Sequence, residues 1–73
     1  MNKHRPKTPV VKHGGLMLWL IGEGFTRTQV RSWLEKGVIP AKRIPGAEIR
    51  YYEVRQVAAT LEIENPLEVP HGR

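Results

Sequence analysis

The feature that most constrains this sequence is the segment over residues 26–37, because both of its ends carry helix signals. Thr26 is followed three residues later by Gln29, the pattern of a capping box, in which each side chain binds a backbone N–H group at the first turn. Gly37 suits the left-handed conformation that ends many helices. Between them, apolar residues recur at the spacing of one helix face: Val30, Trp33 and Leu34. The sequence therefore predicts a helix over residues 27–36 with one buried stripe.

A second helix is expected just before this one. The apolar run over residues 16–21 is rich in Leu and Met, which are good helix formers, and Gly14 and Gly15 break the chain ahead of it. Gly24 fits the left-handed position that follows a helix. We therefore expect a helix over residues 16–23. Two helices joined by a tight turn that contains glycine form a helix-turn-helix.

The following segment predicts a β-hairpin and a third helix. Pro45 and Gly46 mark a turn between two short strands, over residues 41–44 and 47–51. A helix is then expected from residue 53 to residue 61 or 62, without a good cap, because of its apolar spacing: Val54, Val57, Ala58 and Leu61. The predicted fold class is α+β, a small winged helix-turn-helix in the order helix, turn, helix, β-hairpin wing, helix.

The two ends are expected to lie outside this domain. Residues 1–12 are predicted to be a flexible basic arm with a short extended piece at residues 10–11, residues 13–63 the domain, and residues 64–73 a flexible tail. The end of the domain and the tail contain apolar residues that would either fold back on the core or dock on another protein: Ile63, Leu67 and Val69.

The charge is high and uneven. Twelve Lys and Arg against seven Asp and Glu give a net charge of +5. Residues 1–55 carry eleven of the basic residues and four of the acidic ones, whereas residues 56–73 are net acidic. A basic region of this kind is typical of proteins that bind nucleic acid, although a solvated surface kept for solubility has the same composition.

Catalysis is not expected. The three histidines lie near the two predicted ends and lack the i, i+4 partner of a helical metal site: His4, His13 and His71. We expect no enzyme activity, no cofactor and no metal. With no cysteine and an apolar run of only six residues, far below the roughly 20 of a membrane span, we expect a cytoplasmic protein without membrane contact.

The candidate binding residues lie on the second helix and the hairpin. Arginine can bond guanine in a bidentate way and hydroxyls can bond bases or phosphates, so the polar helix face is a candidate for reading DNA: Arg27, Thr28, Arg31 and Ser32. The hairpin adds three cations: Lys42, Arg43 and Arg50. The alternative for each helix residue is an ordinary solvated face. The large apolar side chains are expected in the core, namely Trp19, Trp33, Leu34 and Tyr51, whereas Tyr52 could face the core or a phosphate.

The sequence resembles a known superfamily over residues 16–61. Thr28, the run over residues 33–40, Arg43, and Arg50-Tyr51-Tyr52 are similar to the DNA-binding domain of MerR-type regulators. The same winged module occurs in small phage and mobile-element excisionases (recombination directionality factors) and in some terminase small subunits. The resemblance implies that α-helical residues 27, 28 and 31 face the major groove and that the basic hairpin contacts the minor groove or the backbone.

Two departures from MerR-type activators narrow the resemblance to excisionases. The chain lacks the long dimerisation helix and the cysteines of those activators, so we expect no small-molecule effector, and Tyr52 does not supply their usual Ser or Thr cap. The resemblance then implies double-stranded DNA as the partner, with neighbouring copies and an integrase joining it on bent DNA. The alternatives are a small prophage transcription regulator with the same fold, or a protein-interaction adaptor whose basic face meets an acidic partner.

Overall fold

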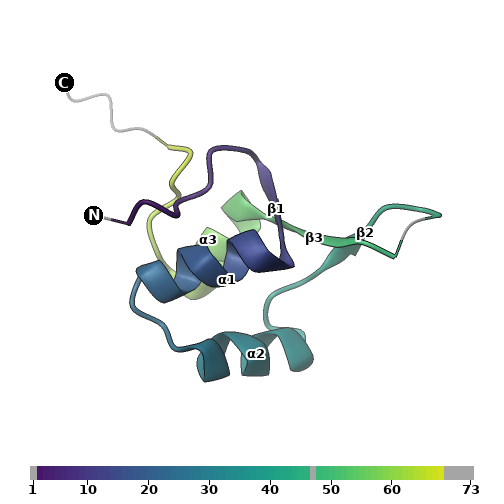
Figure 1. Ribbon diagram of the computed structural model, residues 1–73, viewed down its shortest axis with the longest axis horizontal. Coiled ribbons are helices and arrows are strands. Elements are labelled where there is room, and N and C mark those ends of the chain that lie inside the picture. The colour runs from purple at the N-terminus through teal and green to yellow at the C-terminus, as the bar shows by residue number, and fades with distance from the viewer. Residues whose placement is uncertain (1, 47, 69–73) are drawn as a thin grey trace.

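The computed structural model describes residues 2–46 and 48–68, and it is a small α+β structure with three helices and a three-stranded antiparallel sheet. In chain order the elements are β1 (Val10–Lys12), α1 (His13–Gly22), α2 (Arg27–Glu35), β2 (Lys42–Arg43), β3 (Arg50–Glu53) and α3 (Val54–Leu61). The helices gather at one side and the β2–β3 hairpin extends away from them (Figure 1). Across the described part of the chain, no helix is both long and apolar enough to cross a membrane.

The sheet contains one strand more than the hairpin predicts. Its order is β1-β3-β2, with Val11 opposite Tyr52 and Arg43 opposite Arg50. The placement of residues 10–12 in an arm outside the domain is therefore wrong, because β1 pairs with β3 from Tyr51 to Glu53. The extended piece expected at residues 10–11 is present. Its partner lies some forty residues away, so local signals give no sign of the pairing.

The hairpin is shorter than predicted at its turn, and β3 is longer than predicted at its C-terminal end. Pairing between β2 and β3 stops at Arg43 and Arg50, short of the predicted strand limits at residues 44 and 47. Pro45 has no N–H group to continue the ladder, and Gly46 turns the chain at a φ of 82°. Residue 47 lies outside the described residues. β3 runs on to Glu53 because β1 supplies hydrogen-bonding partners there.

Helix α1 begins three residues earlier than expected. It starts at His13 and includes Gly14 and Gly15, which the sequence suggested would break the chain. Glycine weakens a helix mainly in its interior. Gly14 and Gly15 lie in the first turn of α1, where the N–H groups have no intrahelical acceptor in any helix, so glycine is tolerated there. Gly24 ends the turn after α1 with a φ of 111°, as predicted.

The capping box of α2 is confirmed. The Thr26 hydroxyl accepts from the Gln29 backbone N–H at 3.1 Å, and the Gln29 side chain accepts from the Thr26 N–H at 2.9 Å. The helix ends at Glu35, one residue before the predicted end, and Gly37 follows with a φ of 76°. Helix α3 lacks a side-chain cap, as expected, and ends where Glu62 takes a left-handed conformation.

The core lies between α1, α3 and the inner face of the sheet. Trp19 is fully buried as predicted, together with residues from every helix. Trp33 and Leu34 are partly buried and pack against this core, so they lie at its edge. Tyr51 is half-buried and does not belong to the core, so its assignment is wrong. Trp33 also packs edge-on against Phe25, with ring centroids 5.1 Å apart.

The segment after α3 folds back on the molecule. Ile63 and Leu67 are partly buried against the core, which is the first of the two alternatives for these residues. Val69, the third apolar residue of the predicted tail, lies outside the described residues. Residues 63–68 run close to the N-terminal segment, on the side of the molecule away from the hairpin tip (Figure 1).

Candidate nucleic-acid interface

The orientation of α2 follows from its single buried residue. Val30 is fully buried, and α2 contacts α1, so the opposite face of α2 points outward. Arg27, Thr28 and Arg31 are exposed, and Ser32 is half-buried. At 3.6 residues per turn, Thr28 and Ser32 lie opposite Val30, and Arg27 and Arg31 lie on the flank between them. The structure therefore brings all four predicted helix residues to one side of α2.

The sheet register places two of the hairpin cations on the sheet face that is turned toward the helices. Side chains alternate between faces along a strand, and directly paired residues share a face. Tyr52 is buried on the helix-facing side of β3, so Arg50 lies on that side too, and so does Arg43, its direct partner in β2. We call Arg27, Arg31, Arg43 and Arg50 the arginine array.

Lys42 is separated from the arginine array. It pairs with Tyr51, one residue out of phase with Arg50, and therefore lies on the outer face of the sheet. Its ammonium group forms an ion pair with Glu53 on that face. The hydrogen bond to Glu53, and then the charge of Glu53, raise the pKa of Lys42. Of the three predicted hairpin residues, Lys42 is the one on the outer face of the sheet.

A hollow of about 290 Å³ joins α2 to the hairpin. It is lined by residues from α1, α2 and β3: His13, Arg31, Leu34, Glu35, Arg50 and Tyr52. His13 and Tyr52 were not among the predicted site residues. Tyr52 was left open between core and phosphate contact, and the structure gives it a buried ring that also borders this hollow. Nothing in the local sequence marks His13, because its position depends on where α1 begins.

The arginine array repels itself. Arg27 stands at the first residue of α2, whose N-terminus carries positive partial charge, and that first turn contains no acidic residue. Arg27 and Arg31 are four residues apart, the spacing at which like charges destabilise a helix. Arg43 and Arg50 lie directly opposite each other, the arrangement in which like charges destabilise a sheet. Each feature costs stability in the isolated protein and becomes favourable when an anion lies against it.

The carboxylates that form ion pairs lie elsewhere. Within residues 2–46 and 48–68, the ion pairs are Arg5 with Glu23 at 3.0 Å, Arg5 with Glu64 at 3.3 Å, and Lys42 with Glu53. In this part of the chain no member of the arginine array forms an ion pair. Glu35 is the acidic residue of α2, so the four arginines outnumber the carboxylates beside them.

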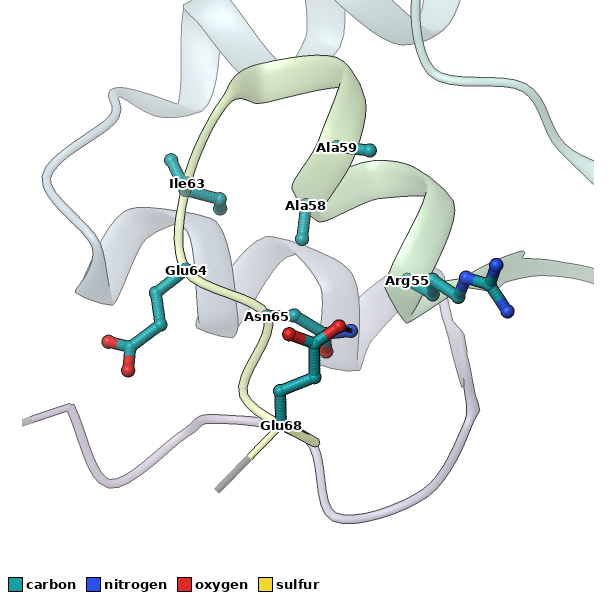
Figure 2. Close-up of a pocket in the computed structure, with 7 residues that line it drawn as sticks. All are labelled: Arg55, Ala58, Ala59, Ile63, Glu64, Asn65 and Glu68. Atoms are coloured by element: carbon teal, nitrogen blue, oxygen red, sulfur yellow. Dashed lines mark hydrogen bonds between the residues drawn. The ribbon is translucent and has the colours of Figure 1, made fainter. Parts of the chain in front are cut away.

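The widest hollow in the described residues has a different character. It measures about 640 Å³ and lies between α3 and the segment after it, with Arg55, Glu64 and Glu68 at its walls (Figure 2). Glu64 binds Arg5, and the Asn65 amide donates to Glu68 at 3.4 Å while its oxygen accepts from the Leu67 N–H. Its polar groups thus hold residues 64–68 in place, and its floor of alanine and isoleucine contributes no nucleophile.

Comparison of the chain with protein-family models, with curated proteins and with solved structures gave no match. The case for a function therefore rests on the arrangement of the residues described above.

Proposed function

We propose that this protein is a non-enzymatic, sequence-specific double-stranded DNA-binding protein of the winged helix-turn-helix type. In this proposal α2 enters the major groove, where Arg27, Arg31 and the hydroxyls of Thr28 and Ser32 contact bases or flanking phosphates. The β2–β3 hairpin is the wing, and Arg43 and Arg50 contact the DNA backbone. The helix order, the capped second helix and the basic hairpin support this reading.

The single observation that carries the proposal is the arginine array. Its four arginines come from α2, β2 and β3, and they are arranged in pairs that repel one another. Arg31 and Arg50 border the same hollow and so link the two pairs. A polyanion is the partner that converts this repulsion into attraction, and duplex DNA presents phosphates along both sides of the groove that a helix enters. An adaptor for an acidic protein would need the same charges, but it would not need hydroxyls beside arginines on one helix face.

We further propose an architectural role in DNA excision. A single module of this kind covers only about 600–1,000 Å² of DNA, too little for high specificity on its own. Neighbouring copies on repeated sites, and an integrase that they assist, would supply the remaining specificity. Bending the DNA costs roughly 1–6 kcal/mol by elastic estimates, which the phosphate contacts offset. A recombination assay with an integrase encoded beside this protein separates this role from transcription regulation, which would use the same surface.

The salt dependence of duplex binding tests the proposal. A preferred duplex is first selected from a random pool, and its affinity is then measured by fluorescence anisotropy across a range of salt concentrations. If the protein neutralises about five phosphates, log K falls against log salt with a slope of about −4 to −5. A slope near zero, or no binding at low salt, contradicts the proposal and favours a protein partner.

A further inference from the structure

Tyr52, which borders the hollow beside α2, has a hydroxyl without a hydrogen-bonding partner among the described residues. Tyr52 is only 3% exposed, yet its hydroxyl makes no hydrogen bond to any described residue. Buried tyrosine hydroxyls usually find a partner. In the described residues, the one fully enclosed side-chain nitrogen or oxygen without a partner is Trp19 Nε1, so the Tyr52 oxygen retains some exposure. Because Tyr52 borders this hollow, we place that exposure there.

Two guanidinium groups border the same hollow from different elements. Arg31 comes from α2 and Arg50 from β3, and Arg43 stands directly opposite Arg50 on the same sheet face. The carboxylate of Glu35 also borders the hollow, but within the described residues it forms no ion pair with either arginine. The hollow therefore has an excess of positive charge and the planar donors that suit a phosphate group.

The N-terminus of α1 forms a third wall of this hollow. His13 is the first residue of this ten-residue helix, and Lys12 at the N-cap makes no side-chain hydrogen bond to the first turn. That turn contains no acidic residue. Gly14 follows, and a side chain at that position would meet nothing within 4 Å, so the backbone there is open to approach. Uncapped N–H groups at a helix start are well suited to an anion.

We propose that this hollow is a seat for one phosphodiester of the DNA backbone, held by the Tyr52 hydroxyl, Arg31, Arg50 and the start of α1 at His13. The inference rests on the proposed function and adds to it a defined backbone contact between the major-groove helix and the wing. A contact of this kind fixes the position of α2 along the duplex without reading sequence. It gives Tyr52 two roles, with its ring in the core and its hydroxyl on the DNA.

The test uses the full chain and a set of duplexes that each carry one uncharged methylphosphonate in place of a phosphate. The seat requires one position at which the substitution weakens the unsubstituted protein by about 10-fold, the usual size of a hydrogen bond to a charged group. Tyr52→Phe retains the ring and removes only the hydroxyl. It should weaken binding to the unmodified duplex for every sequence, and the methylphosphonate at that one position should cost it less than it costs the unsubstituted protein, because one of the contacts is already gone.

Tyr51→Phe is the matched control, because Tyr51 precedes Tyr52 but lies on the outer sheet face. It should bind as the unsubstituted protein does and keep the full loss at the critical phosphate. Arg50→Gln is the second variant, and it should be less sensitive to the same methylphosphonate than the unsubstituted protein is. Thermal unfolding monitored by circular dichroism shows that each variant is folded.

The outcomes separate the seat from the function. If DNA binding is salt-dependent and requires Arg31, but no phosphate position is coupled to both Tyr52→Phe and Arg50→Gln, the seat is wrong and the proposed function stands. If Tyr52→Phe and Tyr51→Phe behave alike, the hydroxyl has no part in binding and the seat is likewise wrong. If the unsubstituted protein shows no salt-dependent binding to any duplex, both inferences fail together.

Discussion

Two groups of charged residues in this protein have opposite electrostatics. On one side, Asn2, Arg5, Glu23 and Glu64 form what we call the terminal clasp, where Arg5 reaches two carboxylates and the Asn2 amide donates to Glu23 at 3.0 Å. The hydrogen bond to Glu23, and then its charge, raise the pKa of Arg5. On the other side, the arginine array has four cations and, within the described residues, no ion pair.

The difference teaches what each set of charges does. In the terminal clasp the charges join the start of the chain, the end of α1 and the segment after α3, so they contribute to the fold. Gly22 leaves room for this contact, because a side chain at that position would meet the Asn2 side chain and displace it. The arginine array joins nothing within the described residues and costs stability through its own repulsion. Charges that do not serve the fold are the ones available to a partner.

The largest expected effect is on stability, and it compares the tryptophans that lie beside the two regions. Trp19 is fully buried and its carbonyl accepts from Asn2 of the terminal clasp at 2.9 Å, whereas Trp33 is half-buried on α2. Trp19→Ala should lower the free energy of unfolding by about 3–5 kcal/mol, enough to unfold a domain of this size. Trp33→Ala should cost roughly half as much, since less apolar area is lost. Chemical denaturation measures both, and equal losses would show that the α2 side is as deeply packed as the clasp side.

Next in size are the arginines of α2. Arg27→Ala and Arg31→Ala should each weaken binding to the selected duplex by about 5- to 150-fold and reduce discrimination against other sequences. Arg5→Ala removes the same charge from the terminal clasp and should leave DNA affinity unchanged. Competition binding with specific and random duplexes measures both quantities. The comparison between the two regions breaks if Arg5→Ala weakens binding as much as Arg31→Ala does.

Acid should affect the terminal clasp through Glu23. Burial raises the pKa of Glu23, but hydrogen bonds from Asn2 and Arg5 and the charge of Arg5 outweigh burial, so its pKa lies below the ordinary value. The indole of Trp19 adds a weaker favourable interaction without reaching hydrogen-bonding geometry. Glu23 therefore stabilises the fold fully above the pKa of an unfolded glutamate, about 4.3. That contribution is lost as the pH falls through the lower folded value.

The variant Glu23→Gln should remove this pH dependence. At neutral pH it should lower the free energy of unfolding by about 1–2 kcal/mol, the range for a hydrogen bond to a charged group. Below pH 4 its stability should approach that of the unsubstituted protein. Glu62→Gln is the control, since Glu62 is exposed and outside the ion pairs of the described residues. Denaturation midpoints are measured for both variants across the acid range. If the two variants show the same pH dependence, Glu23 does not stabilise the fold through the terminal clasp.

The cap of α2 lies between the two regions. Thr26→Ala removes the hydroxyl that accepts from Gln29 and should destabilise the fold by about 0.5–2 kcal/mol. Thr26→Ser retains that hydroxyl and should restore most of the loss. In our proposal the cap orients α2 without contacting DNA. The DNA affinity of the variant, measured at a low temperature at which it is fully folded, should therefore change little. A large loss of affinity in a fully folded Thr26→Ala protein would place Thr26 itself on the DNA.

What the sequence could predict was what its local signals encode. The helix over residues 27–35 was predicted to within one residue, because Thr26, Gln29 and Gly37 act on their immediate neighbours. The faces of Arg43 and Lys42 could not be predicted, since they depend on the register of β2 against β3 and on the burial of Tyr52. The terminal clasp could not be predicted either, because its contacts join residues 18 to 59 positions apart.

The smallest expected effect is also the finest test, because it compares neighbouring residues on opposite faces of β2. Arg43→Ala should weaken binding to all sequences evenly and make the salt slope shallower by about 1. Lys42→Ala should leave the slope nearly unchanged, because Lys42 is held by Glu53 on the outer face. Equal changes in slope would mean that the hairpin contacts DNA with both faces. Glu53→Gln then separates the two reasons for a silent Lys42. If direction is the reason, releasing the ammonium group leaves affinity unchanged, because the lysine still lies away from the DNA. If pairing alone is the reason, Glu53→Gln raises affinity, and Lys42 belongs with the arginine array after all.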